Sequence, residues 1–127
     1  MDKYLQQSQS TIIQFKKETE LDETLFIYVK EGKETHKIYL KDILYIESLR
    51  EYLVIHLIEK SIQVIYRISE FEEKLPLNYF IRIHKSYIVS VKKITSFSSN
   101  FIKIDTTELP IGRTYSDGVK KALDVGF

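Results

Sequence analysis

The chain has no cysteine, which excludes disulfide bonds, thiolate nucleophiles and zinc sites with sulfur ligands. A reducing compartment fits this composition. The sequence also lacks any apolar run near the ~18 residues that a membrane-spanning helix needs. The first ten residues, MDKYLQQSQS, contain neither the basic segment nor the apolar segment of a secretory signal. We therefore expect a cytoplasmic protein without a membrane anchor.

Motifs for catalysis and cofactor binding are missing as well. The four glycines are scattered and form no phosphate-binding loop and no dinucleotide-binding fingerprint. The histidines His36, His56 and His84 are far apart in the sequence, so a metal site would need three distant segments to converge. His56 lies in the apolar run LVIHLI, where a hydrogen-bonded histidine is more common than a metal ligand. We expect no enzyme activity, no cofactor and no metal.

What is present is the composition of one globular domain with an uneven distribution of charge. Of the 127 residues, 43% are hydrophobic and 29% are charged, with a net charge of +1. The stretch from Lys74 to Ile104 nevertheless contains no acid, which suggests an anionic partner. On composition alone, a solvated face with counter-charges from other strands is the commoner explanation. The cations of this stretch are Lys74, Arg82, Lys85, Lys92, Lys93 and Lys103.

Short runs of β-branched and aromatic residues dominate the chain after residue 24, and turn signals separate them. Their alternation of apolar and polar residues predicts sheets with one face in water. Long helices between the strands, as in βαβ units, are missing. The sequence therefore predicts a mainly β domain of hairpins. The predicted strands are Leu25–Lys30, Lys37–Leu40, Ile43–Ile46, Tyr52–Ile58, Ile62–Arg67, Phe80–Ile83, Tyr87–Val91, Ile94–Phe97, Phe101–Ile104 and Leu109–Ile111.

Only three segments have helical character. Asp2–Lys17 is polar with a thin apolar set, so we interpret it as a linker or a docking helix. Ser69–Leu75 begins with the capping-box pattern of Ser69 and Glu72, in which each side chain bonds a backbone N–H of the other. Asp117–Leu123 places two lysines in its last turns, where the helix dipole favours cations.

The densest group of polar side chains is in residues 79–92, YFIRIHKSYIVSVK. Arg82, His84 and Ser86 occupy alternate positions and would share one face of an extended segment with Phe80. Such donors suit the recognition of phosphates and base edges. They equally suit an internal hydrogen-bond network that ties a turn to the sheet. Both interpretations hold in part, and Lys85 is the better candidate for an outward contact.

This segment resembles the signature of LytTR-type DNA-binding domains, the output domains of many bacterial response regulators. The agreement covers about residues 25–124, and four motifs occur in the order that the family has. Two positions depart from the family pattern, because Ser90 stands where Asn is common and Gly112 where serine is frequent. The matching motifs are Ile43-Leu44-Tyr45-Ile46-Glu47-Ser48, Phe71-Glu72-Glu73-Lys74-Leu75-Pro76, Phe80-x-Arg82-x-His84-Lys85-Ser86-Tyr87-x-Val89, and Leu109-Pro110-Ile111-Gly112-Arg113-x-Tyr115.

The resemblance implies an elongated arrangement of small antiparallel sheets with one or two short helices. It also implies sequence-specific binding of double-stranded DNA, with loops rather than a recognition helix in successive major grooves. Arg113 is the strongest candidate for a base contact, because a guanidinium can bond both O6 and N7 of guanine. Arg82 and His84 are expected in a structural network. The candidate DNA-binding residues are Arg50, Glu51, Tyr52, Lys85, Ser86, Lys92, Lys93, Arg113 and Tyr115.

Further partners follow from the same resemblance. We expect a second copy of the chain on repeated half-sites and an upstream receiver or sensor domain, for which residues 1–24 are too short. Residues 1–24 are then a linker or docking helix, and residues 25–127 are the DNA-binding domain. The competing hypothesis is a β-rich protein-interaction module that binds a peptide by strand addition and has no nucleic-acid partner.

Overall fold

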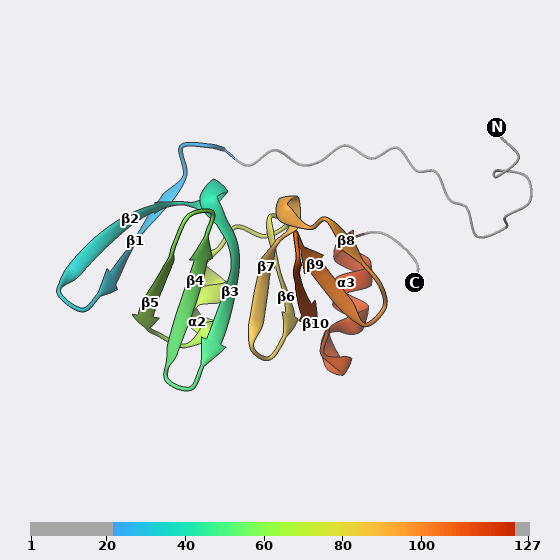
Figure 1. Ribbon diagram of the computed structural model, residues 1–127. Coiled ribbons are helices and arrows are strands. Elements are labelled where there is room, and N and C mark those ends of the chain that lie inside the picture. Colours follow the sequence, from blue (N-terminus) through green and yellow to red (C-terminus); the bar gives the residue numbers. More distant parts are fainter. Residues whose placement is uncertain (1–21, 124–127) are drawn as a thin grey trace, which may run out of the picture.

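The computed structural model describes residues 22–123, and it is built mainly of short antiparallel strands (Figure 1). Two α-helices, α2 (Ile68–Lys74) and α3 (Ser116–Leu123), and three single-turn 3₁₀ helices complete it. The 3₁₀ helices are Leu40–Asp42, Val91–Lys93 and Arg113–Tyr115. The strands are β1 (Phe26–Glu31), β2 (Glu34–Tyr39), β3 (Ile43–Leu49), β4 (Tyr52–Leu57), β5 (Ser61–Ile65), β6 (Phe80–His84), β7 (Tyr87–Ser90), β8 (Ser96–Phe97), β9 (Phe101–Ile104) and β10 (Thr107–Pro110).

The strands form three antiparallel sheets that follow one another along an elongated molecule (Figure 1). A two-stranded sheet of β1 and β2 lies at one end, and a three-stranded sheet in the order β10-β9-β8 lies near the other. Between them is a five-stranded sheet in the order β5-β4-β3-β7-β6. The predicted fold class, small antiparallel sheets with two short helices, is confirmed.

Two hydrophobic cores lie on opposite faces of the β6–β7 pair. Phe80 and Ile88 belong to a core shared with β1–β5 and α2, whereas Ile83 and Val89 belong to a core shared with β9, β10 and α3. Consecutive residues of β7 are therefore buried, and its Ser90 is only 5% exposed. The expectation of sheets with one wet face holds for β5, where burial alternates, but it is wrong for β7. A strand between two cores has no face left for water.

Element boundaries moved by a few residues from the predicted ones, and one local interpretation is wrong. The helix α2 begins after Arg67, and no side chain caps its N-terminus. Ser69 is the second residue of that helix, so the predicted capping box with Glu72 does not form. Its end is as predicted, because Leu75 precedes a proline and is extended. The predicted helical segment Asp2–Lys17 lies outside the described residues.

Candidate nucleic-acid interface

Three loops lie together at one edge of the molecule, the lower edge in Figure 1. They are the β3–β4 turn, the β6–β7 turn and the 3₁₀ segment before α3. The N–H of Ser48 donates to the carbonyl of Ser86 at 2.8 Å and joins the first loop to the second. The N–H of Gly112 donates to the carbonyl of Ile83 at 2.8 Å and joins the third loop to β6. We call this the three-loop surface, with residues Arg50–Tyr52, Lys85–Ser86 and Arg113–Tyr115.

The β3–β4 turn projects two charged side chains into solvent. Leu49 pairs with Tyr52, so Arg50 and Glu51 form a two-residue hairpin turn. Arg50 has a φ of 56°, a left-handed conformation that is uncommon for a residue with a Cβ. Both side chains are exposed, whereas that of Tyr52 is half-buried. The turn thus offers a cation and an anion side by side.

The Arg82 side chain makes three hydrogen bonds, two to backbone carbonyls of the β6–β7 turn and one to α2. Its Nε donates to the carbonyl of His84 at 2.8 Å, and one terminal nitrogen donates to the carbonyl of Lys85 at 2.8 Å. The other terminal nitrogen binds a carboxylate oxygen of Glu72 on α2 at 2.7 Å. Each of the three guanidinium nitrogens therefore already has a hydrogen-bond partner within the protein. The Lys85 side chain is exposed and has no ion pair within residues 22–123.

His84 closes the same turn through its imidazole ring. Its Nδ1 accepts a hydrogen bond from the N–H of Ser86 at 3.0 Å, which requires that nitrogen to be unprotonated. Partial burial, with further contributions from Lys85 and Arg82, lowers the pKa of His84 below its ordinary value. The lowered pKa favours the neutral ring, which is the state that can accept the bond from Ser86. A bulge between Arg82 and His84 interrupts the predicted alternation after Arg82. Phe80 is buried in the core that includes α2, and Arg82, two positions later, bonds Glu72 of the same helix.

The third loop presents one free cation beside a packed tyrosine. Arg113 is exposed and makes no ion pair in the part of the chain that the structure describes. The ring of Tyr115 lies 5.5 Å from the Arg82 guanidinium carbon and is half-buried. A Cβ on Gly112 would come within 3.1 Å of that ring. A residue larger than glycine would therefore require the tyrosine ring to shift by a few tenths of an ångström.

Lys92 and Lys93 are not brought to the three-loop surface. The turn of Lys85 and Ser86 precedes β7, and the 3₁₀ helix with both lysines follows it. The four residues of β7 span about 13 Å at ~3.3 Å per residue. These two lysines thus lie at the opposite end of β7 from the three-loop surface.

Sequence reasoning missed a group of polar rings around Glu47. One carboxylate oxygen of Glu47 lies 3.1 Å from Nε2 of His56, and the other accepts from the Tyr87 hydroxyl at 3.5 Å. Tyr45 stacks on the His56 ring with centroids 4.2 Å apart. Partial burial and the charge of Glu47 raise the pKa of Tyr45 and Tyr87. The prediction of a hydrogen-bonded His56 is confirmed, and only strand register could have shown its partner.

The β1–β2 hairpin brings His36 to two carboxylates that sequence spacing did not connect with it. Its Nε2 lies 3.1 Å from an oxygen of Glu31 and 3.7 Å from one of Glu34. One potential ligand atom from each residue fits within 4.8 Å of the others. Glu31 and Glu34 pair directly across the hairpin turn. The signal in the sequence is the short turn Gly32-Lys33, which places residues three apart opposite each other.

The family model described as the LytTr DNA-binding domain matches residues 33–124. The chain belongs to this family. The predicted resemblance is thus confirmed, and the matched region includes all three loops of the three-loop surface.

Individual relatives of this LytTR domain agree with the assignment. It is 32% identical over 91 residues to the sensory transduction protein LytT of Bacillus subtilis, covering 67% of this chain and 38% of the relative. It is 29% identical over 84 residues to the transcriptional regulatory protein NatR of the same species, covering 66% and 36%. The chain therefore spans well under half of the length of these relatives.

A solved structure shows the same fold as this LytTR domain. It is described as the LytTr DNA-binding domain of a Bacillus cereus response regulator, and the two superpose with a TM-score of 0.69 at 25% identity. The match covers 80% of this chain and 97% of the other. None of the helices in residues 22–123 has the length and apolar character needed to cross a membrane.

Proposed function

We propose that this LytTR domain binds double-stranded DNA sequence-specifically through the three-loop surface, as the output domain of a bacterial transcriptional regulator. The observation that carries the proposal is the alignment of three loops along one edge, each with an exposed cation that makes no ion pair within residues 22–123. Those cations are Arg50, Lys85 and Arg113. Loops held this way suit successive major grooves, where base edges carry a distinct donor and acceptor pattern.

Each loop has a different role in this proposal. Arg113 reads a base, since its exposed guanidinium makes no ion pair with any described residue and can make two bonds to guanine. Lys85 and Arg50 contact phosphates or base edges, with Ser86 as a hydrogen-bond donor. Glu51 accepts from an amino group such as cytosine N4. Tyr52 and Tyr115, both half-buried, support the loops beside these contacts.

The proposal extends to the setting of the domain. A second copy binds a repeated half-site, and a receiver or sensor domain precedes residues 25–127 in the regulator. Residues 1–24 are the linker to it, the domain works in the cytoplasm, and it carries no catalytic activity. Lys92 and Lys93, at the opposite end of β7, form no part of the proposed contact.

Binding at several salt concentrations tests the proposal. Genomic fragments selected by the full chain are footprinted, and affinity for one selected site is measured by fluorescence anisotropy. DNA binding through phosphates weakens steeply with salt, whereas peptide pairing changes much less. We expect a protected repeat and a steep linear fall of log affinity with log salt. No detectable binding at low salt would refute the proposal and leave the protein-interaction module as the function.

A further inference from the structure

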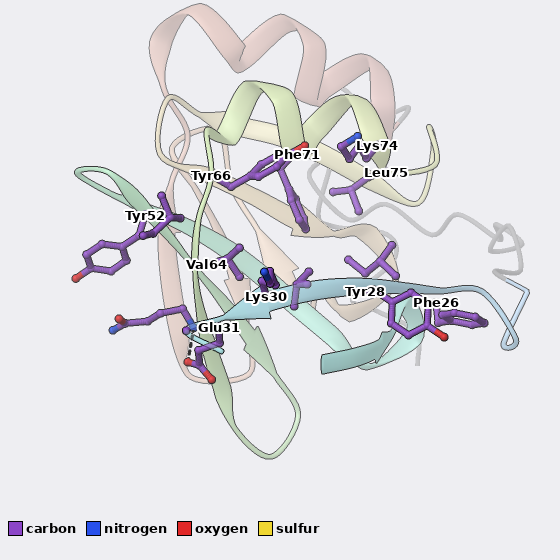
Figure 2. A pocket seen from close by; sticks show the side chains of 15 residues that line it. Phe26, Tyr28, Lys30, Glu31, Tyr52, Val64, Tyr66, Phe71, Lys74 and Leu75 are labelled. Carbon is purple, nitrogen blue, oxygen red and sulfur yellow. Dashed lines mark hydrogen bonds between the residues drawn. The ribbon is translucent and has the colours of Figure 1, made fainter. Parts of the chain in front are cut away.

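A groove outside the three-loop surface runs between β1, β5 and α2, with a volume of ≈1110 Å³. Figure 2 shows its lining side chains, with Phe26 and Tyr28 on β1, Val64 in the middle and Phe71 and Leu75 from the side of α2. Only Tyr52 is shared with the three-loop surface. The groove is therefore a separate feature of the fold.

Both strands that border the groove have an unpaired edge. In the described part of the chain β1 pairs only with β2, and β5 only with β4. Because Glu31 and Glu34 flank a two-residue turn, the backbone groups of Phe26, Tyr28 and Lys30 point away from β2, toward the free edge. An extended chain placed there can pair with three residues of β1.

The groove has an apolar floor and exposed apolar walls. Val64, Phe71 and Leu75 on its floor are at most 6% exposed and belong to the core. On its walls, Tyr28 is 65% exposed and Ile65 is 84% exposed. Strand edges and large apolar side chains exposed together are a hazard that proteins normally avoid unless the surface binds something. Side chains of an added strand would cover both walls.

The unpaired charges at the groove are positive. Lys30 and Lys74 are exposed and take part in no ion pair within residues 22–123. The single acid of the lining, Glu31, is already occupied. One of its oxygens accepts from the backbone N–H of Gln63 at 3.0 Å, and the other contacts His36. A partner with negative charge is therefore favoured.

We propose that the groove binds an extended acidic segment of another protein, which adds as a strand to the free edge of β1. Side chains on alternate positions of that segment are apolar and face Val64, Phe71 and Leu75. Those between them are acidic and lie beside Lys30 and Lys74. The Glu31–Gln63 bond ties β1 to β5 and closes one end, so the added strand runs beside Phe26–Lys30. This inference does not depend on DNA binding.

Synthetic peptides test the inference with the full chain. One short acetylated peptide alternates valine with glutamate, and a matched one alternates valine with lysine. We expect the acidic peptide to bind at least about tenfold more tightly at low salt. In the complex, hydrogen exchange followed by nuclear magnetic resonance should slow at the amides of Phe26, Tyr28 and Lys30. If neither peptide binds, the proposal is overturned. The same holds if the peptides fail to bind because the chain's own first 21 residues occupy the groove.

Charge reversal provides the matched control. The double variant Lys30→Glu with Lys74→Glu should reverse the preference, losing the acidic peptide and gaining the basic one. Lys92→Glu with Lys121→Glu makes the same change in net charge at exposed sites outside the groove lining and should keep the original preference. Equal effects of the two double variants, or slowed amides elsewhere in the chain, would show that the peptides bind by general charge alone.

Discussion

Replacing Arg82 with methionine should loosen the β6–β7 turn while keeping most of the apolar stem of the side chain. The Arg82 side chain is 13% exposed, and its guanidinium makes three hydrogen bonds. The bond to the His84 carbonyl is partly buried, and a bond with a charged donor contributes about 1.5–3 kcal/mol. The bond to the Lys85 carbonyl is exposed, so water replaces much of it. We therefore expect Arg82→Met to lower the free energy of unfolding by about 2–3 kcal/mol.

The ion pair with Glu72 should contribute little to that loss. The Glu72 side chain is 43% exposed, and exposed pairs contribute about 0–1 kcal/mol because solvent screens them. Glu72→Gln is thus the control and should cost less than about 1 kcal/mol. Urea unfolding followed by circular dichroism measures both variants, since the chain has no tryptophan. If the two variants lose the same stability, the bonds to the turn carbonyls do not hold the loop and our reasoning is wrong.

Three further predictions concern the remaining loop residues. Arg113→Ala should weaken DNA binding by about 1–3 kcal/mol and relax the sequence preference at one base position. If the variant loses folding stability but keeps its sequence preference, this loop does not read a base. Lys85→Ala should lower the slope of log affinity against log salt by about one unit, whereas Lys92→Ala should leave it unchanged, as anisotropy titrations would show. The pKa of His84 in the folded chain is lowered below its ordinary 6.5, so the unfolded chain takes up the proton first as pH falls. The contribution of His84 to stability is therefore present above pH 6.5 and is lost as pH falls through the folded pKa. Urea unfolding at several pH values should show a smaller pH dependence in His84→Ala than in the unchanged chain.

The strands could be predicted from the sequence because their signal is local. Phe101–Ile104 coincides with β9, and the runs around Tyr52 and Tyr87 begin β4 and β7 at those residues. Contacts across strands could not be predicted, since they depend on register. Nothing local shows that Glu47 lies opposite Val54 and near His56, or that Glu72 on a helix meets Arg82 on a strand.

The candidate site divides in the same way. The residue types of the loops and their order indicated a DNA-binding family, because motifs are local patterns. Their positions in space were beyond that argument. Lys92 follows Lys85 by only seven positions, yet β7 lies between them and places Lys92 at its opposite end. The groove lined by Tyr28 and Val64 could likewise not be predicted from the sequence, because four other elements separate β1 from β5 along the chain.

The burial of β7 on both faces has a consequence for how the domain unfolds. Ile88 and Val89 are neighbours in sequence but belong to different cores. If either core unfolds, β7 loses apolar contacts on one face, and the same strand supports the other core. An elongated row of small sheets could otherwise come apart in stages, as repeat arrays do. Because the two cores share one strand, we expect unfolding to be a single cooperative transition, in which the spacing between the loops is kept until the whole domain unfolds.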